Sequence, residues 1–134
     1  MPLRPQGKIL VVDDDEIMRD FYVRVFDNLG YRTVCAHDGE EAIAVLRDRP
    51  HEFALIMLDL DIPGRSGWDV ISHVHGTTVL SCIPVIVIAG LSVDQAELQR
   101  LLDLGDHVIL KGEFEMARLC DAVNRLLKQG CYRG

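Results

Sequence analysis

Four charged side chains stand directly after apolar runs of the sequence, where they could do chemistry. Asp13 and Asp14 follow the first such run, Asp59 follows the third, and Lys111 follows the fifth. If the chain brings these runs together, the carboxylates repel one another and raise each other's pKa unless a cation lies among them. A hard divalent cation bound through oxygen, most simply Mg²⁺, would relieve that repulsion.

Together these groups suit the transfer of a phosphoryl group to a carboxylate. In such a reaction the carboxylate is the nucleophile, and nearby cations neutralise the charge that develops on the phosphoryl oxygens. Lys111 would supply one movable positive charge of this kind. A lone aspartate after a strand more often caps a helix, and we expect Asp15 to do so ahead of a helix that begins near Glu16. Three acidic positions and a lysine, each at the end of a strand, favour a functional site instead.

The elements that must position these residues alternate along the chain. Strands are expected at 8–12, 32–36, 53–58, 85–89 and 108–110, and helices at about 16–29, 39–49, 67–74, 93–104 and 114–128. Five alternating pairs in a chain of 134 residues predict right-handed βαβ crossovers and an α/β, three-layer, doubly wound sheet. Ligands of such sheets bind at the carboxyl ends of the strands, which is where the charged side chains stand.

Helical periodicity also assigns faces to some of these helices. In the first helix four apolar residues recur at intervals of four along one face, namely Ile17, Phe21, Val25 and Leu29. In the fourth helix Leu98, Leu101 and Leu102 are expected to face mostly the core, and Trp68 is expected to pack the third helix.

Length and composition indicate a single globular domain. Hydrophobic residues make up 49% of the chain and charged residues 26%, enough apolar residues for a real core. We expect a flexible segment over 1–6, the folded domain over 7–129 and a tail over 130–134. A net charge of −7 argues against a basic surface for nucleic acid, and neither a signal peptide nor a membrane-spanning run is recognisable.

The cysteines indicate a reducing compartment. Cys35, Cys82, Cys120 and Cys131 lie far apart and form no CxxC pair. This spacing predicts free cysteines used as small apolar residues in a cytoplasmic protein.

Two motifs carry a resemblance to a known family. Residues 8–16, KILVVDDDE, resemble the opening strand and acidic pair of bacterial response-regulator receiver domains. Residues 58–68, LDLDIPGRSGW, resemble the phosphorylation loop of that family, with Pro63, Gly64 and Gly67 at its spacing. The resemblance covers about residues 7–129. It implies a flavodoxin-like (βα)5 sandwich with a five-stranded parallel sheet in the order 2-1-3-4-5.

The resemblance also implies a role for each site residue. Asp59 would be the phosphoacceptor. Mg²⁺ would be bound directly by Asp14 and Asp59, through water by Asp13, and by the backbone carbonyl of Asp61. Lys111 would pair with Asp59 or with its phosphoryl group.

The implied partners are those of two-component signalling. The phosphoryl donor would be a phosphohistidine on a sensor histidine kinase or on a phosphotransfer protein. The domain would regulate a downstream protein or an output domain, with no direct contact to nucleic acid or membrane. It would be a regulatory domain that assists its own phosphorylation and dephosphorylation, and not an enzyme with a separate substrate.

Three positions depart from the family pattern. Ala89 stands where the family has a hydroxyl that donates to the phosphoryl group, and Val108 replaces the usual aromatic residue three before the lysine. Gly112 replaces the proline that normally follows the lysine. Ser92 could reach the site, but 92–95 fits a helix capping box better. We therefore expect a site that accepts a phosphoryl group and transmits it unconventionally.

Two other functions compete with this interpretation. A pseudo-receiver would bind partners without phosphorylation, which the changes at Ala89 and Gly112 favour and the retained acidic residues oppose. A phosphatase of the haloacid-dehalogenase type is suggested by Asp59-Leu-Asp61, which resembles that family's nucleophile motif. Pro63 stands where that family has a hydroxyl residue, and the motif leaves the acidic pair at 13–14 unexplained.

Overall fold

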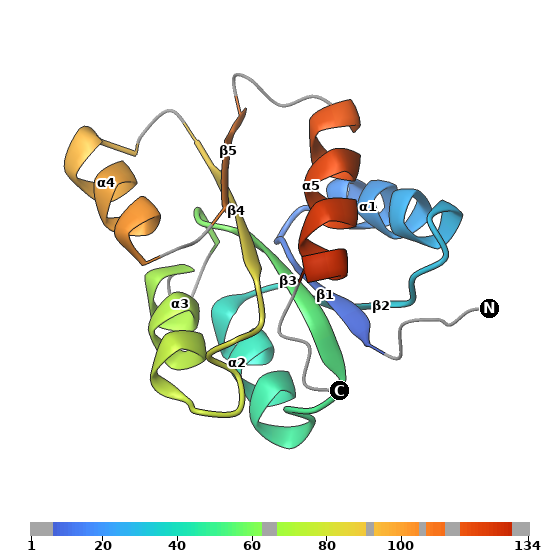
Figure 1. The fold of residues 1–134 in the computed structure, drawn as a ribbon, viewed down its shortest axis with the longest axis horizontal. Coiled ribbons are helices and arrows are strands. Elements are labelled where there is room, and N and C mark those ends of the chain that lie inside the picture. Colours follow the sequence, from blue (N-terminus) through green and yellow to red (C-terminus); the bar gives the residue numbers. More distant parts are fainter. Residues whose placement is uncertain (1–6, 63–66, 91–92, 105–106, 112–115, 130–134) are drawn as a thin grey trace.

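The computed structural model describes residues 7–62, 67–90, 93–104, 107–111 and 116–129 (Figure 1). The expected flexible segment at 1–6 and the tail at 130–134 lie outside these ranges. So do Ser92 and Gly112, two of the positions singled out in the sequence.

Five strands and five helices alternate along the chain, as the apolar pattern predicts. The strands are β1 (Lys8–Val12), β2 (Thr33–Ala36), β3 (Phe53–Asp59), β4 (Val85–Ala89) and β5 (His107–Leu110). The helices are α1 (Glu16–Asn28), α2 (Gly39–Asp48), α3 (Gly67–Gly76), α4 (Gln95–Asp103) and α5 (Met116–Gln129). All neighbouring strands are parallel, and the sheet order β2-β1-β3-β4-β5 confirms the predicted flavodoxin-like topology.

The sheet is covered on both faces, so successive residues of a central strand enter different cores. In β1, Leu10 and Val12 pack on the side of α2, α3 and α4, whereas Ile9 and Val11 pack on the side of α1 and α5 (Figure 1). This double burial explains why the central strands are continuously apolar and do not alternate.

The buried face of α1 differs from the face that the sequence suggests. Ile17 is 78% exposed and Phe21 41% exposed, whereas Tyr22 and Phe26 are buried against the sheet. The physical reason is that an α-helix has 3.6 residues per turn, so a repeat of four drifts round the helix. The core stripe therefore joins Val25 and Leu29 from that set to Tyr22 and Phe26.

The start of α4 also differs from the expectation. Asp94 is its N-cap, accepting from the Glu97 backbone N–H at 2.8 Å, while Glu97 accepts from the Asp94 N–H at 3.2 Å. The capping box expected at 92–95 is therefore wrong, because this reciprocal pair starts the helix two residues later. Leu101 is fully buried, but Leu102 is 51% exposed and does not face the core as expected.

The cysteines correct one further expectation. Cys35 and Cys120 are free, but Cys82 is disulfide-bonded. The prediction that every cysteine is a free thiol is therefore wrong at Cys82, and the cysteines do not indicate a reducing compartment. Among the described helices, none combines the length and the apolar character needed to cross a membrane.

Candidate functional site

Three carboxylates converge at the carboxyl edge of the sheet. β1 ends at Val12 and is followed by Asp13 and Asp14, while Asp59 is the last residue of the neighbouring strand β3. One carboxylate oxygen from each of the three aspartates lies within 4.8 Å of the others. Asp13 and Asp59 are buried, each with 6% exposure, whereas Asp14 is exposed to solvent.

Backbone amides hold the two buried carboxylates in place. The Asp15 N–H donates to Asp13 Oδ1, and the Asp61 N–H donates to Asp59 Oδ1, both at 2.9 Å. Each carboxylate keeps further acceptor sites, because a carboxylate has about four lone-pair sites. The fixed orientation leaves these remaining sites available to a cation or a reacting group.

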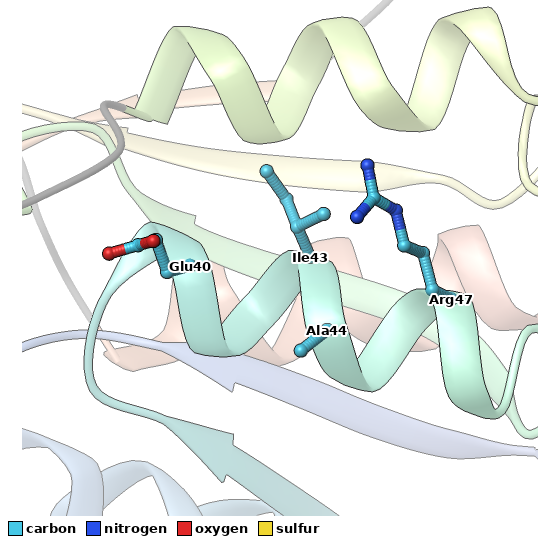
Figure 2. Close-up of a pocket in the computed structure, with 4 residues that line it drawn as sticks. All are labelled: Glu40, Ile43, Ala44 and Arg47. Carbon is cyan, nitrogen blue, oxygen red and sulfur yellow. The ribbon is translucent and has the colours of Figure 1, made fainter.

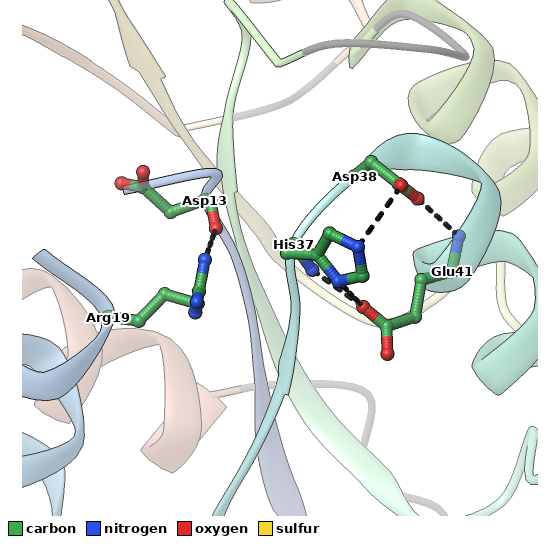
Figure 3. Close-up of polar contacts among 5 residues, drawn as sticks. All are labelled: Asp13, Arg19, His37, Asp38 and Glu41. Atoms are coloured by element: carbon green, nitrogen blue, oxygen red, sulfur yellow. Dashed lines mark hydrogen bonds and ion pairs between the residues drawn. The ribbon is translucent and has the colours of Figure 1, made fainter. Parts of the chain in front are cut away.

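The turn after β1 is also tied to α1. Arg19 donates from its guanidinium to the backbone carbonyl of Asp13 at 2.8 Å, as Figure 3 shows. Asp15 caps α1 by accepting from the Ile17 N–H at 2.9 Å, which confirms its predicted capping role. The acidic turn is therefore part of the helix start and is held from both sides.

Burial and the carboxylate charges of the cluster raise the pKa of Asp13 and that of the neighbouring Tyr22. Burial raises the pKa of Asp13, and the charges of Asp59 and Asp14 raise it further, against the opposing effects of the Asp15 N–H and Lys111. The pKa of the buried Tyr22 phenol is raised by burial and then by Asp13 and Asp59. Tyr22 was not expected near the site from the sequence, because the apolar face predicted for α1 does not include it. The face of α1 that the structure buries does include Tyr22.

Lys111 brings a positive charge to the acceptor candidate from the fifth strand. Its Nζ lies 3.3 Å from Asp59 Oδ2, and its side chain is 45% exposed while that of Asp59 is 7% exposed. Lys111 follows β5 directly, so three different strands contribute to the group.

Such a donor set fits a hard divalent cation. Carboxylate oxygens are the ligands that Mg²⁺ prefers, and unpaired carboxylates this close together are unfavourable without a cation. The pKa of Asp13 is raised chiefly by burial and further by the charges of Asp59 and Asp14. Asp13, Asp14 and Asp59 could therefore hold Mg²⁺.

Of the positions that depart from the expected pattern, Ala89 lies at the carboxyl edge of the sheet, while Val108 lies further back in β5. Ala89 is the fully buried last residue of β4, and Val108 of β5 is half-buried against the core. A Cβ on Gly90 would lie 2.6 Å from Asp61 Oδ2, so the Asp61 carboxylate occupies the space that this glycine leaves. From the sequence, only the backbone carbonyl of Asp61 was expected to contribute to the site. The missed signal is the pairing of an acidic residue at 61 with a glycine at 90.

The contacts at the start of α2 lie outside the carboxylate group. The His37 ring contacts the carboxylates of Asp38 and Glu41, and the backbone N–H of His37 donates to the Glu41 carboxylate at 2.8 Å (Figure 3). Asp38 in turn caps α2 through the Glu41 N–H at 2.7 Å, so this set fixes the start of the helix.

A pocket of about 230 Å³ lies along α2, lined by Glu40, Ile43, Ala44 and Arg47 (Figure 2). It includes none of the three aspartates or Lys111. The chemistry of the described residues therefore centres on the carboxyl edge of the sheet and not on this pocket.

Comparison with known proteins agrees with the fold. The profile of the response regulator receiver domain family matches residues 9–124. The chain is 31% identical over 123 residues to response regulator RR06 of Streptococcus pneumoniae, covering 90% of this chain and 53% of RR06. It is 32% identical over 125 residues to the transcriptional regulatory protein CpxR of Klebsiella pneumoniae, covering 92% of this chain and 50% of CpxR. The chain thus spans about half the length of these curated relatives.

Solved structures show the same fold over nearly the whole chain. The signal receiver domain of a signal transduction histidine kinase from Syntrophus aciditrophicus is similar with a TM-score of 0.82 and 28% identity, covering 96% of this chain and 95% of that one. A response regulator receiver protein from Pseudomonas putida is similar with a TM-score of 0.80 and 26% identity, covering 92% and 99%.

Proposed function

Because this chain belongs to the response regulator receiver domain family, we propose that its Asp59 accepts a phosphoryl group from a phosphohistidine donor. The observation that carries the proposal is the convergence of three strands on Asp59, which meets the carboxylates of Asp13 and Asp14 and the ammonium of Lys111. The donor would be a sensor histidine kinase or a phosphotransfer protein.

The transfer is a displacement at phosphorus. A carboxylate oxygen of Asp59 forms a bond to phosphorus, and the bond from phosphorus to the donor's histidine nitrogen breaks. The electron pair stays on that nitrogen, and the imidazole takes up a proton.

The residues of the chain prepare this step. The Asp61 N–H orients the Asp59 carboxylate by a hydrogen bond of 2.9 Å. The ammonium of Lys111 lies close enough to Asp59 to pair with an oxygen of the transferred phosphoryl group. Asp13, Asp14 and Asp59, with the backbone carbonyl of Asp61, would hold Mg²⁺. When bound, Mg²⁺ supplies positive charge against the charge that develops on the transferring group.

Phosphorylation would then regulate a downstream protein or an output domain. The relatives RR06 and CpxR are about twice as long as this chain, and CpxR is a transcriptional regulatory protein. The proposed location is the cytoplasm, where the kinase domain that donates the phosphoryl group would lie. This placement rests on the proposed donor and no longer on the cysteines.

A second candidate function is a pseudo-receiver that binds partners without being phosphorylated. It is favoured by Ala89, which cannot donate the hydrogen bond that the family's hydroxyl gives to a phosphoryl group. The buried pair Asp13 and Asp59 counts against it, because binding alone does not require two carboxylates in a nearly dry site.

Intact mass spectrometry after incubation with Mg²⁺ and acetyl phosphate separates the two functions. We expect one phosphoryl addition to the native protein, and none to Asp59→Asn or to native protein with a chelator. Asp27→Asn, which changes an exposed aspartate of α1, should be phosphorylated like the native protein. A folded native protein that gains no phosphoryl group from acetyl phosphate or from a phosphohistidine protein would contradict the proposal and support the pseudo-receiver.

A further inference from the structure

The residue after the acceptor candidate is packed directly against the start of α3. Leu60 follows Asp59, and its N–H donates to the Ile88 carbonyl of β4 at 3.0 Å. A Cβ on Gly67 would lie 2.8 Å from the Leu60 carbonyl oxygen and 2.9 Å from Leu60 Cα. The two backbones are therefore in close contact, and a displacement of Leu60 pushes on the first residue of α3 without passing along the intervening loop.

Trp68, which follows Gly67 in α3, connects this contact to α4. Trp68 is partly buried against the core, and the Arg100 guanidinium of α4 lies 4.6 Å from the centre of its ring. A cation within about 6 Å of an indole face is attracted by the ring. Figure 1 shows α3 and α4 on the same face of the sheet. Asp59, Leu60, Gly67, Trp68 and Arg100 thus form a continuous series of contacts.

α4 is held loosely enough for this contact to matter. Within its described residues Leu101 is buried, while Leu102 is 51% exposed and Arg100 is exposed. A helix anchored by few buried side chains opens and shifts at low cost in free energy. One cation–π contact is then a sizeable part of what fixes its position.

We propose that the Trp68–Arg100 contact transmits the phosphorylation state of Asp59 to α4. This route replaces the hydroxyl and aromatic pair that the chain lacks at Ala89 and Val108. The inference rests on the proposed phosphorylation and adds the means by which it is read. Arg100 touches neither Asp59 nor Lys111 in this scheme, so its substitution leaves the acceptor chemistry unchanged.

Backbone hydrogen exchange of α4 tests the route in the full chain. Each sample is measured with Mg²⁺ alone and with Mg²⁺ and acetyl phosphate, and intact mass gives the phosphorylated fraction. In the native protein we expect phosphorylation to change the exchange rate of the α4 amides by roughly two- to fivefold, the factor an exposed cation–π contact supplies. In Arg100→Gln the phosphorylated fraction should be unchanged and the α4 response lost.

Two further variants keep the result interpretable. Arg24→Gln, which removes an exposed arginine of α1 on the other face of the sheet, should keep the native α4 response. Trp68→Phe retains a ring with a weaker cation–π attraction, so the exchange response of its α4 should be reduced.

Trp68 is the chain's single tryptophan, so its fluorescence emission should change on phosphorylation in the native protein and not in Asp59→Asn.

The outcomes separate the two proposals. If neither acetyl phosphate nor a phosphohistidine protein adds a phosphoryl group, the proposed function fails and the route fails with it. If the protein is phosphorylated but the α4 response in Arg100→Gln equals that of the native protein, the route is overturned and the proposed function stands. A native α4 that does not respond to phosphorylation overturns the route in the same way.

Discussion

At the scale of single residues, the end of β4 is where the resemblance to the family implies a departure from its pattern. Ala89 is buried, and Gly90 leaves room for the Asp61 carboxylate. A methyl group and a carboxylate therefore lie where the resemblance implies a hydroxyl in the family. Neither can donate a hydrogen bond to a phosphoryl oxygen while the carboxylate is ionised.

Restoring the hydroxyl should strengthen binding of a phosphoryl group. Ala89→Thr adds a donor whose charge-assisted hydrogen bond is worth about 1.5–3 kcal/mol. Ala89→Val adds nearly the same volume without the hydroxyl, so strain from overpacking is common to both variants. We expect Ala89→Thr to bind beryllofluoride in the presence of Mg²⁺ about 10- to 150-fold more tightly than Ala89→Val. Equal affinities in a calorimetric titration would show that position 89 no longer faces the phosphoryl group.

At the scale of elements, α1 offers the sharpest test of which face is buried. Phe26 is fully buried, whereas Phe21, five residues earlier on the same helix, is 41% exposed. Phe26→Ala should lower the free energy of unfolding by about 3–5 kcal/mol, because it leaves a cavity under the helix. Phe21→Ala should lower it by roughly 1 kcal/mol or less. Urea denaturation measures both, and similar losses would contradict the observed orientation of α1.

This helix also shows where sequence patterns stop being informative. Strands were predictable because runs such as residues 85–89 are apolar and mostly β-branched, and glycines and prolines separate them. The rotation of α1 was not, since a repeat of four and a repeat of 3.6 fit the same short segment. Only packing of Tyr22 and Phe26 against the sheet distinguishes them.

In the candidate site, too, some features were predictable from the sequence and others were not. The meeting of Asp13, Asp14 and Asp59 was predictable, because parallel strands end at one edge of the sheet. The position of the Asp61 carboxylate beside Gly90 depends on the rotamer of Asp61 and on contact between two loops. No local pattern in the sequence encodes such a contact.

At the scale of the whole molecule, the buried charge of Asp13 links stability to pH and to metal. Its folded-state pKa lies above its ordinary value of 3.8, chiefly because of burial. The unfavourable contribution is therefore fully present at pH values above the raised pKa. It is relieved as the pH falls through that pKa, because the folded protein then binds the proton more readily than the unfolded chain does.

We therefore expect Asp13→Asn to be more stable than the native protein at neutral pH without metal. The gain should be roughly 3–5 °C in Tm, the shift that about 1 kcal/mol produces in a domain of this size. The difference should shrink on acidification through the raised pKa, and Mg²⁺ should raise the Tm of the native protein more than that of the variant. Calorimetry over a pH series, with and without Mg²⁺, measures this, and a difference that grows on acidification would contradict it.

The strand order has a consequence for how the molecule is made. β1 is synthesised first, yet it lies inside the sheet between β2 and β3, with Ile9 beside both Thr33 and Leu55. A nascent chain therefore carries an apolar strand with an unpaired edge until the segment that ends at Asp59 has left the ribosome. Pairing across such sequence distances is slow and exposes the chain to aggregation. The strand that bears Asp59 is thus also the one that covers this edge during synthesis.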